Sequence, residues 1–183
     1  MAGIFQSSVL TKKGIALLAK AQTGRCAITL TKAAAGDGTH ILGEDLTACT
    51  DLKAKKQTFP LTTVTTQNLT NVFVKFIMAN KQESGSLLHG YYVKEIGIYA
   101  NDPDEGEILY AIAIGVENQW DYMPAYNELL PSTITVDFLV EVSNADTVTI
   151  QMPNRLYLYD DSTGKKYGFG IENGLFYYEE EKA

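Results

Sequence analysis

The sequence predicts a mainly β protein of the α+β type. An antiparallel, β-sandwich-like body is expected to carry one N-terminal amphipathic helix, and a small β meander is expected at the C-terminus. Three observations indicate this fold: a helical period of apolar residues before residue 24, a period of two in most later segments, and a Tyr- and Gly-rich tail after Pro153. The 183 residues suffice for one sizeable core with an appendage. We expect a body over residues 1–152 and a meander over residues 153–183.

A helix is predicted over residues 11–23. Ile15, Leu18 and Ala19 follow one another at helical spacing, and lysines are available for the solvent-exposed side. Thr11 can cap the start of this helix, and Gly24 can end it. Because an isolated helix of this length is only marginally stable, we expect it to pack on a sheet.

The chain then changes to strand patterns. Residues 26–36 are rich in β-branched residues and lead into a Gly-Asp-Gly turn, and residues 39–58 predict a loop with one short helix. Strands are expected next over residues 58–67 and 71–80. Apolar residues on both faces of the second segment predict a strand that is covered on both sides.

A hairpin is predicted from residue 91 to residue 115. Its strands, residues 91–100 and 107–115, flank an acidic turn in which Pro103 presets φ and Gly106 can take a positive φ. Further strands are expected over residues 133–143, where apolar residues line one side, and over residues 146–152.

The tail contains three short strand patterns separated by turn sequences, which predicts a three-stranded meander. A sheet of this size is too small to be reliably stable alone, so we expect it to pack on the body or against a partner. Its rings either form the core of the meander or offer exposed surface to a sugar or a protein. The candidate partner-binding residues are therefore Tyr157, Tyr159, Tyr167, Phe169, Phe176, Tyr177 and Tyr178.

Charge and cysteine content argue against several classes of protein. A net charge of −7 disfavours a nucleic-acid surface, which needs clustered Lys and Arg. Cys26 and Cys49 form no C-x-x-C pair and no Cys/His cluster, so no zinc site is predicted and both thiols are expected to be free. No segment approaches the roughly 18–20 apolar residues of a membrane span, so no membrane insertion is expected.

The groups that an enzyme needs are not found in a catalytic pattern. His40 and His89 stand in predicted turns and are interpreted as solvated. Neither a serine-nucleophile motif nor a phosphate-binding loop occurs, and the acidic run 102–107 lacks the spacing of a calcium loop. We therefore expect no catalytic residue, no cofactor and no metal. Carboxylates that could in principle pair as in a glycosidase are Asp160, Asp161, Glu172, Glu179, Glu180 and Glu181.

The order of several segments resembles the N-terminal attachment domain of phage tail-collar fibre proteins. The resemblance covers roughly residues 8–151 and is carried by "TKKGIALLAKAQTG", "ITLTKAAAGDG", "LTACTDLKAKKQTFPLT", "YVKEIGIYANDPDEGEILYAIA" and "ITVDFLVEVSNADTVTI". It implies a structural protein that attaches tail fibres to the baseplate of a phage, or of a phage-derived particle such as a contractile bacteriocin. It also implies a homotrimer, made in the bacterial cytoplasm and assembled into the tail.

The short tail departs from the family pattern, in which a long shaft and a receptor-binding tip follow the attachment domain. Two interpretations follow. The chain is an adaptor whose body binds baseplate proteins and whose meander docks a separate fibre or receptor-binding protein, or the meander is itself a minimal tip that contacts a host glycan or protein. A third alternative, a small cell-wall or polysaccharide hydrolase, would use the tail carboxylates.

Overall fold

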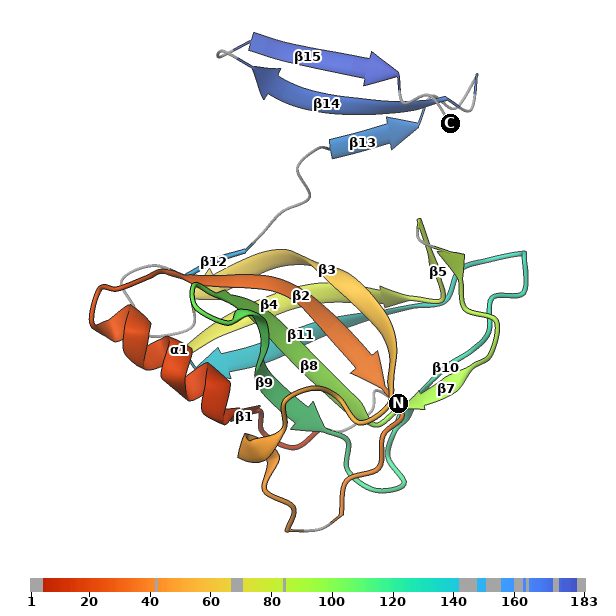
Figure 1. The fold of residues 1–183 in the computed structure, drawn as a ribbon. Helices are drawn as coiled ribbons and strands as arrows, with labels where there is room; N and C mark the ends of the chain where they lie inside the picture. The colour runs from red at the N-terminus through yellow and green to blue at the C-terminus, as the bar shows by residue number, and fades with distance from the viewer. Residues whose placement is uncertain are drawn as a thin grey trace. The chain divides into compact units, whose positions relative to one another are not determined.

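The computed structural model describes residues 5–41, 43–66, 71–83, 85–141, 148–150, 156–159, 163, 165–172 and 175–180. The chain divides into two compact units, residues 1–151 and 152–183 (Figure 1). Each unit is described by itself below.

Helix α1 (Lys12–Gln22) is the helix that the sequence predicts, but its buried face is rotated from the expected one: Leu17, Leu18 and Ala21 are buried with Gly14, whereas Ile15 and Ala19 are exposed. The Thr11 side chain accepts a hydrogen bond from the backbone N–H of Gly14 (3.0 Å) and so caps the N-terminus. At the other end, Gly24 has a φ of 71°. The N–H of Gly24 donates to Ala21 (2.9 Å) and the N–H of Arg25 donates to Lys20 (3.0 Å), which is the Schellman pattern of helix termination. Both predicted helix signals are confirmed.

The body is built on one large sheet. Its strands lie in the order β1-β9-β8-β2-β3-β4-β11, and all of these neighbours are antiparallel. A further strand, β12, pairs with β2 in parallel. The strand bounds are β1 (Val9–Leu10), β2 (Ile28–Gly36), β3 (Lys55–Thr66), β4 (Asn71–Ala79), β8 (Glu95–Asp102), β9 (Gly106–Ile114), β11 (Thr133–Glu141) and β12 (Val148–Ile150).

Smaller elements decorate this sheet. A 3₁₀ turn, η1 (Leu46–Ala48), lies in the segment that the sequence predicts as a loop with one short helix. Two short antiparallel pairs form between β7 (Tyr91–Val93) and β10 (Asp121–Met123) and between β5 (Lys81–Gln82) and β6 (Gly85–Ser86). Residues 91–100, expected to form one strand, are interrupted at Lys94: β7 pairs with β10, whereas β8 continues in the large sheet.

The large sheet curls so that its two edges approach each other (Figure 1). Ser8, next to edge strand β1, donates a hydrogen bond to the carbonyl of Leu139 in edge strand β11 (2.5 Å). The inner face holds a continuous core that includes Leu30, Phe76 and Ile98, all fully buried. The prediction of a mainly β body with one N-terminal helix is confirmed, and the sandwich-like body is a single curled sheet.

Strand β4 corrects one expectation. Val74, Phe76 and Met78 are buried, but Lys75 is exposed and Ile77 is 45% exposed on the outer face. The prediction that β4 is covered on both faces is therefore wrong for the single chain. The reason is that the curl encloses only the inner face, and α1 packs beside β9 rather than over β4.

The C-terminal unit contains the predicted three-stranded meander. Its strands β13 (Leu156–Tyr159), β14 (Lys166–Glu172) and β15 (Leu175–Glu180) pair antiparallel in chain order. In the backbone register Phe169 lies opposite Tyr178, and Tyr157 lies opposite Gly168.

Candidate functional site

The predicted partner-binding rings lie on the three strands of the meander. Tyr178 is 69% exposed, whereas Tyr177 is partly buried. The rings of Tyr167 and Tyr178 meet edge to face, with their centroids 6.0 Å apart. This arrangement joins one partly buried ring to one that faces solvent. The side chains of four further candidates lie outside the described part of the structure: Tyr157, Tyr159, Phe169 and Phe176.

In the described part of the structure, no two carboxylates of the tail lie together as a pair. Glu180 forms an ion pair with Lys165 at 2.9 Å, in which both side chains are about half exposed, and Glu179 is also exposed. Asp160, Asp161 and Glu181 lie outside the described residues, as does the side chain of Glu172. An exposed carboxylate paired with a lysine is a solvated surface group, not a buried general acid.

An aromatic cluster on the body was not found from the sequence. Tyr92 of β7 lies opposite Tyr122 of β10, with ring centroids 5.1 Å apart, and the Trp120 ring lies 6.3 Å from that of Tyr92. Both tyrosines are 52% exposed. Gly90 leaves room for this packing, because a Cβ there would overlap the Tyr122 ring. The aromatic residues were visible in the sequence, but no local pattern joins residue 92 to residues 120–122.

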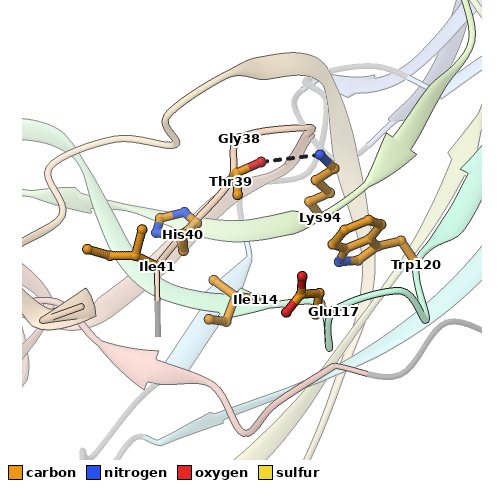
Figure 2. Close-up of a pocket in the computed structure, with 9 residues that line it drawn as sticks. Gly38, Thr39, His40, Ile41, Lys94, Ile114, Glu117 and Trp120 are labelled. Atoms are coloured by element: carbon orange, nitrogen blue, oxygen red, sulfur yellow. Dashed lines mark hydrogen bonds between the residues drawn. The ribbon is translucent and has the colours of Figure 1, made fainter. Parts of the chain in front are cut away.

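A pocket of about 300 Å³ adjoins this cluster (Figure 2). The Lys94 ammonium lies 4.7 Å from the centroid of the Trp120 ring and donates a hydrogen bond to the Thr39 hydroxyl (3.2 Å). Glu117 and His40 also line the pocket, which therefore mixes charged, aromatic and apolar groups. Such a lining suits binding of a polar or amphipathic group.

Beside the pocket, Glu95 is a fully buried carboxylate. It accepts backbone hydrogen bonds from the N–H groups of Gly38 (3.1 Å), Lys53 (3.0 Å) and Ala54 (2.8 Å). A fourth contact joins its Oε2 to Nε2 of His40 at 2.9 Å. This set of donors satisfies the buried carboxylate and holds the loop at residues 37–54 against β8.

The Gly-Asp-Gly segment has a different role from the turn that the sequence suggests. A Cβ at Gly36 or at Gly38 would overlap the Glu95 carboxylate. Both glycines are thus required for the close approach of the backbone to this buried group.

The interpretation of His40 as a solvated residue is wrong. Its side chain is only 2% exposed, because the contact with Glu95 draws the imidazole into the body. On the other side of the ring, Nδ1 lies 3.3 Å from Oε2 of Glu44 but has no hydrogen-bond partner. Neither ring nitrogen forms a hydrogen bond with a hydroxyl or thiol group. The arrangement therefore lacks the nucleophile–base contact of covalent catalysis. His89 is exposed, as expected.

Both cysteines are free thiols, as the sequence predicts. Cys49 packs on a small apolar cluster that includes Leu52 and Tyr99. Burial is the main cause that raises the pKa of the Cys49 thiol, and the nearby carboxylate of Glu44 adds to it. In this environment Cys49 is a protonated thiol at neutral pH rather than an activated nucleophile.

The acidic turn of the β8–β9 hairpin is a structural cap, as expected. The Asp102 carboxylate is buried and accepts hydrogen bonds from the N–H groups of Asp104 (2.8 Å) and Glu105 (3.1 Å). It also accepts a hydrogen bond from the Lys20 ammonium. These donors occupy the oxygens that a calcium ion would need.

Comparison with protein families identifies the class of protein. The family model described as phage tail-collar fibre protein, N-terminal, matches residues 1–160. The chain belongs to this family. No curated protein and no solved structure compared with this tail-collar fibre protein matches it.

Family membership gives the tail-collar fibre protein a structural role in a phage tail. The match spans the body and the first strand of the meander, and residues 161–183 lie beyond it. In the described part of the chain, no helix is both long and apolar enough to cross a membrane.

Proposed function

We propose that this protein is a connector. It joins the baseplate of a contractile phage-like tail to a distal fibre or receptor-binding protein. The observation that carries this proposal is the division of the chain: the family match covers the body, whereas most of the ring-rich meander lies beyond the matched region. An attachment role shared with the family for the body and a separate binding role for the meander account for both facts.

The body is the part that we assign to the baseplate. It offers exposed rings on short paired strands, Tyr92 and Tyr122, beside a pocket with charged and apolar lining. Aromatic residues held by a rigid scaffold are the side chains that contribute most to protein interfaces. The supporting arrangement is one of binding groups, not of reacting groups.

The meander is the part that we assign to the distal protein. Its three strands form a compact unit of their own, with β13 and β15 as edges. Edge strands and exposed rings such as Tyr178 favour pairing with a partner. Glu179 and Glu180 add an acidic rim to this surface.

A truncation tests this division of labour. A chain ending at Gln151 is expected to remain folded and to bind the baseplate, but to lose the distal protein in a pull-down from assembled tails. Within the full chain, Tyr157→Ala and Tyr177→Ala are expected to weaken that attachment by over ~2 kcal/mol each. Lys165→Ala is the matched control, because its ion pair with Glu180 is half exposed and such pairs contribute little. Retention of the distal protein at full affinity by the truncated chain would move the connector surface to the body.

The exposed ring of Tyr178 also favours a second candidate function, direct contact of the meander with a host glycan. An exposed aromatic ring offers a flat apolar face on which the apolar face of a sugar can stack. Binding of the full chain to a glycan array, abolished by Tyr178→Ala, would support this receptor-binding role. Binding of the distal protein alone would support the connector.

A further inference from the structure

Three side chains with metal-binding atoms meet beside Glu95: His40, Glu44 and Cys49. Their ligand atoms all lie within 4.8 Å of one another. The three residues come from one segment, in which Cys49 directly follows the η1 turn and His40 lies near the buried carboxylate. The cluster thus lies within ten residues of the sequence, and the long-range contact with Glu95 fixes the position of the His40 ring.

The imidazole of His40 is oriented for metal binding. A carboxylate only accepts hydrogen bonds, and Glu95 already receives three backbone N–H groups, so Nε2 of His40 carries the proton. Nδ1 then presents its lone pair 3.3 Å from the Glu44 carboxylate, buried and without a hydrogen-bond partner. Oε2 of Glu44 already accepts hydrogen bonds from Lys53 (2.7 Å) and from the N–H of Ile41 (3.1 Å). Nδ1 of His40 is therefore the buried atom without a partner, and a cation beside it would supply that partner.

We propose that Nδ1 of His40, the carboxylate of Glu44 and Sγ of Cys49 bind a divalent transition metal of the zinc type. A set of one nitrogen, one oxygen and one sulfur suits zinc and its borderline neighbours, whereas the sulfur disfavours calcium and magnesium. Three protein ligands leave a fourth position for water or a partner's side chain. Cys49 binds as the thiolate, and its proton passes to solvent.

The surroundings supply the outer contacts that such a site needs. Glu95 fixes the His40 ring through Nε2, which is the carboxylate–histidine–metal arrangement that sets the ring's orientation and basicity. Oε2 of Glu44 accepts a hydrogen bond from the Lys53 ammonium at 2.7 Å. Glu44 therefore binds the metal either through its other oxygen or through Oε2 after Lys53 has moved away. Lys53 is 41% exposed and is free to move into solvent.

A small movement of the loop completes the geometry. Ligand atoms in a tetrahedral zinc site lie roughly 3.3–3.8 Å apart, as follows from the bond lengths of such sites. Nδ1 of His40 and Oε2 of Glu44 already have this spacing. The sulfur of Cys49 lies within 4.8 Å of both ligand atoms, so rotation of its side chain can bring it to this spacing. The bound metal would fasten the loop beside the pocket that His40 lines.

Cobalt provides a direct test with the full-length protein. After removal of metal with a chelator, addition of Co²⁺ is expected to give one equivalent of binding, a near-ultraviolet thiolate-to-cobalt band and intense visible bands of a four-coordinate ion. Zn²⁺ is expected to abolish these bands by displacement. In competition with a chromophoric chelator, Cys49→Ser and His40→Gln are expected to lose Zn²⁺ binding, and Glu95→Gln to weaken it roughly 10- to 100-fold.

The chain contains a matched control for the cysteine ligand and for the histidine ligand. Cys26→Ser and His89→Gln remove the other free cysteine and the other histidine, and both variants are expected to bind as the unaltered protein does. Far-ultraviolet circular dichroism checks folding. If His40→Gln or Glu95→Gln does not fold, Cys49→Ser decides the matter because it is nearly isosteric. The proposal is overturned by a missing thiolate band, by an unchanged band in Cys49→Ser, or by a ¹⁵N spectrum with both His40 nitrogens protonated in excess Zn²⁺.

Discussion

At the scale of single residues, Gly14 shows how tightly the helix meets the sheet. It lies in the first turn of α1, and a Cβ added there would overlap the backbone carbonyl oxygen of Tyr110 in β9. Tyr110 is itself fully buried. Since this contact is made by backbone atoms on both sides, neither partner can rotate away.

Gly14→Ala is therefore expected to destabilise the protein. Helix propensity alone predicts the opposite sign, a gain of about 1 kcal/mol. The clash predicts a loss of about 1–3 kcal/mol, because overpacking displaces the helix from its site. Urea denaturation followed by circular dichroism measures the sign. Ala16→Gly, at an exposed position of the same helix, is the control and is expected to cost about 1 kcal/mol. A stabilised Gly14→Ala variant would contradict the close contact.

At the scale of elements, α1 is tied to the β8–β9 turn by charged groups. Lys20 lies 2.7 Å from Asp102 and 2.9 Å from Asp104, and Lys13 lies 2.6 Å from Glu105. Burial opposes ionisation of Asp102, but the hydrogen bonds from Lys20 and from two backbone N–H groups outweigh it and lower the pKa of this carboxyl. The hydrogen bond with Asp102 in turn raises the pKa of Lys20.

This link predicts the direction of an acid effect. A carboxyl whose pKa is lower in the folded state contributes stability above its unfolded pKa of about 3.9, and loses it as the pH falls through the folded pKa. Asp102→Asn is expected to cost about 1–3 kcal/mol at pH 7, because it weakens hydrogen bonds to a buried charged group. The difference from the unaltered protein is expected to shrink below about pH 4.

Denaturation at pH 7, 5 and 3 measures this dependence. Asp104→Asn serves as the control: its side chain is 47% exposed, so its ion pairs are expected to contribute less than about 1 kcal/mol. A constant deficit of Asp102→Asn over the whole pH range would show that the charge of Asp102 is not the source of the stabilisation.

At the scale of the whole molecule, the outer face of β4 and β11 exposes two large apolar side chains in the single chain. Ile77 is 45% exposed and Leu139 is 39% exposed, and the register places Leu139 opposite Phe73. Between them, Lys75 and Asp137 form an ion pair at 3.4 Å. Exposed apolar side chains on both sides of a charged pair are compatible with a surface that a second copy covers.

We expect the protein to form a homotrimer through this face, at least in the assembled tail. The double variant Ile77→Lys, Leu139→Lys is expected to shift the sedimentation coefficient from trimer toward monomer without loss of folding, since both side chains are exposed. Leu88→Lys, at a position that is 80% exposed elsewhere on the body, is the control and is expected to leave assembly unchanged. A single copy per attachment point in images of the tail would contradict the trimer.

The sequence-based predictions that the structure confirms depend on local interactions between neighbouring residues. The cap at Thr11, the positive φ of Gly24 and the turn between β8 and β9 all depend on a few neighbouring residues. The period of two placed the strands, and the order of segments indicated the tail-collar fibre family that the family comparison shows. Such signals lie within a window that a single sequence displays.

Tertiary structure alone decided the features that join distant residues. Sequence gives no sign that Glu95 reaches back to His40, that Tyr92 meets Trp120, or that the sheet curls until Ser8 meets Leu139. Each of these contacts depends on the path of the chain between its partners rather than on the residues beside them. The sequence by itself therefore determined the helix with its ends, the main strands and the family, but not the break at Lys94 or the short strand pairs β5–β6 and β7–β10. Packing decided which side chains are buried and which groups meet, because burial and long-range contact are properties of the assembled sheet.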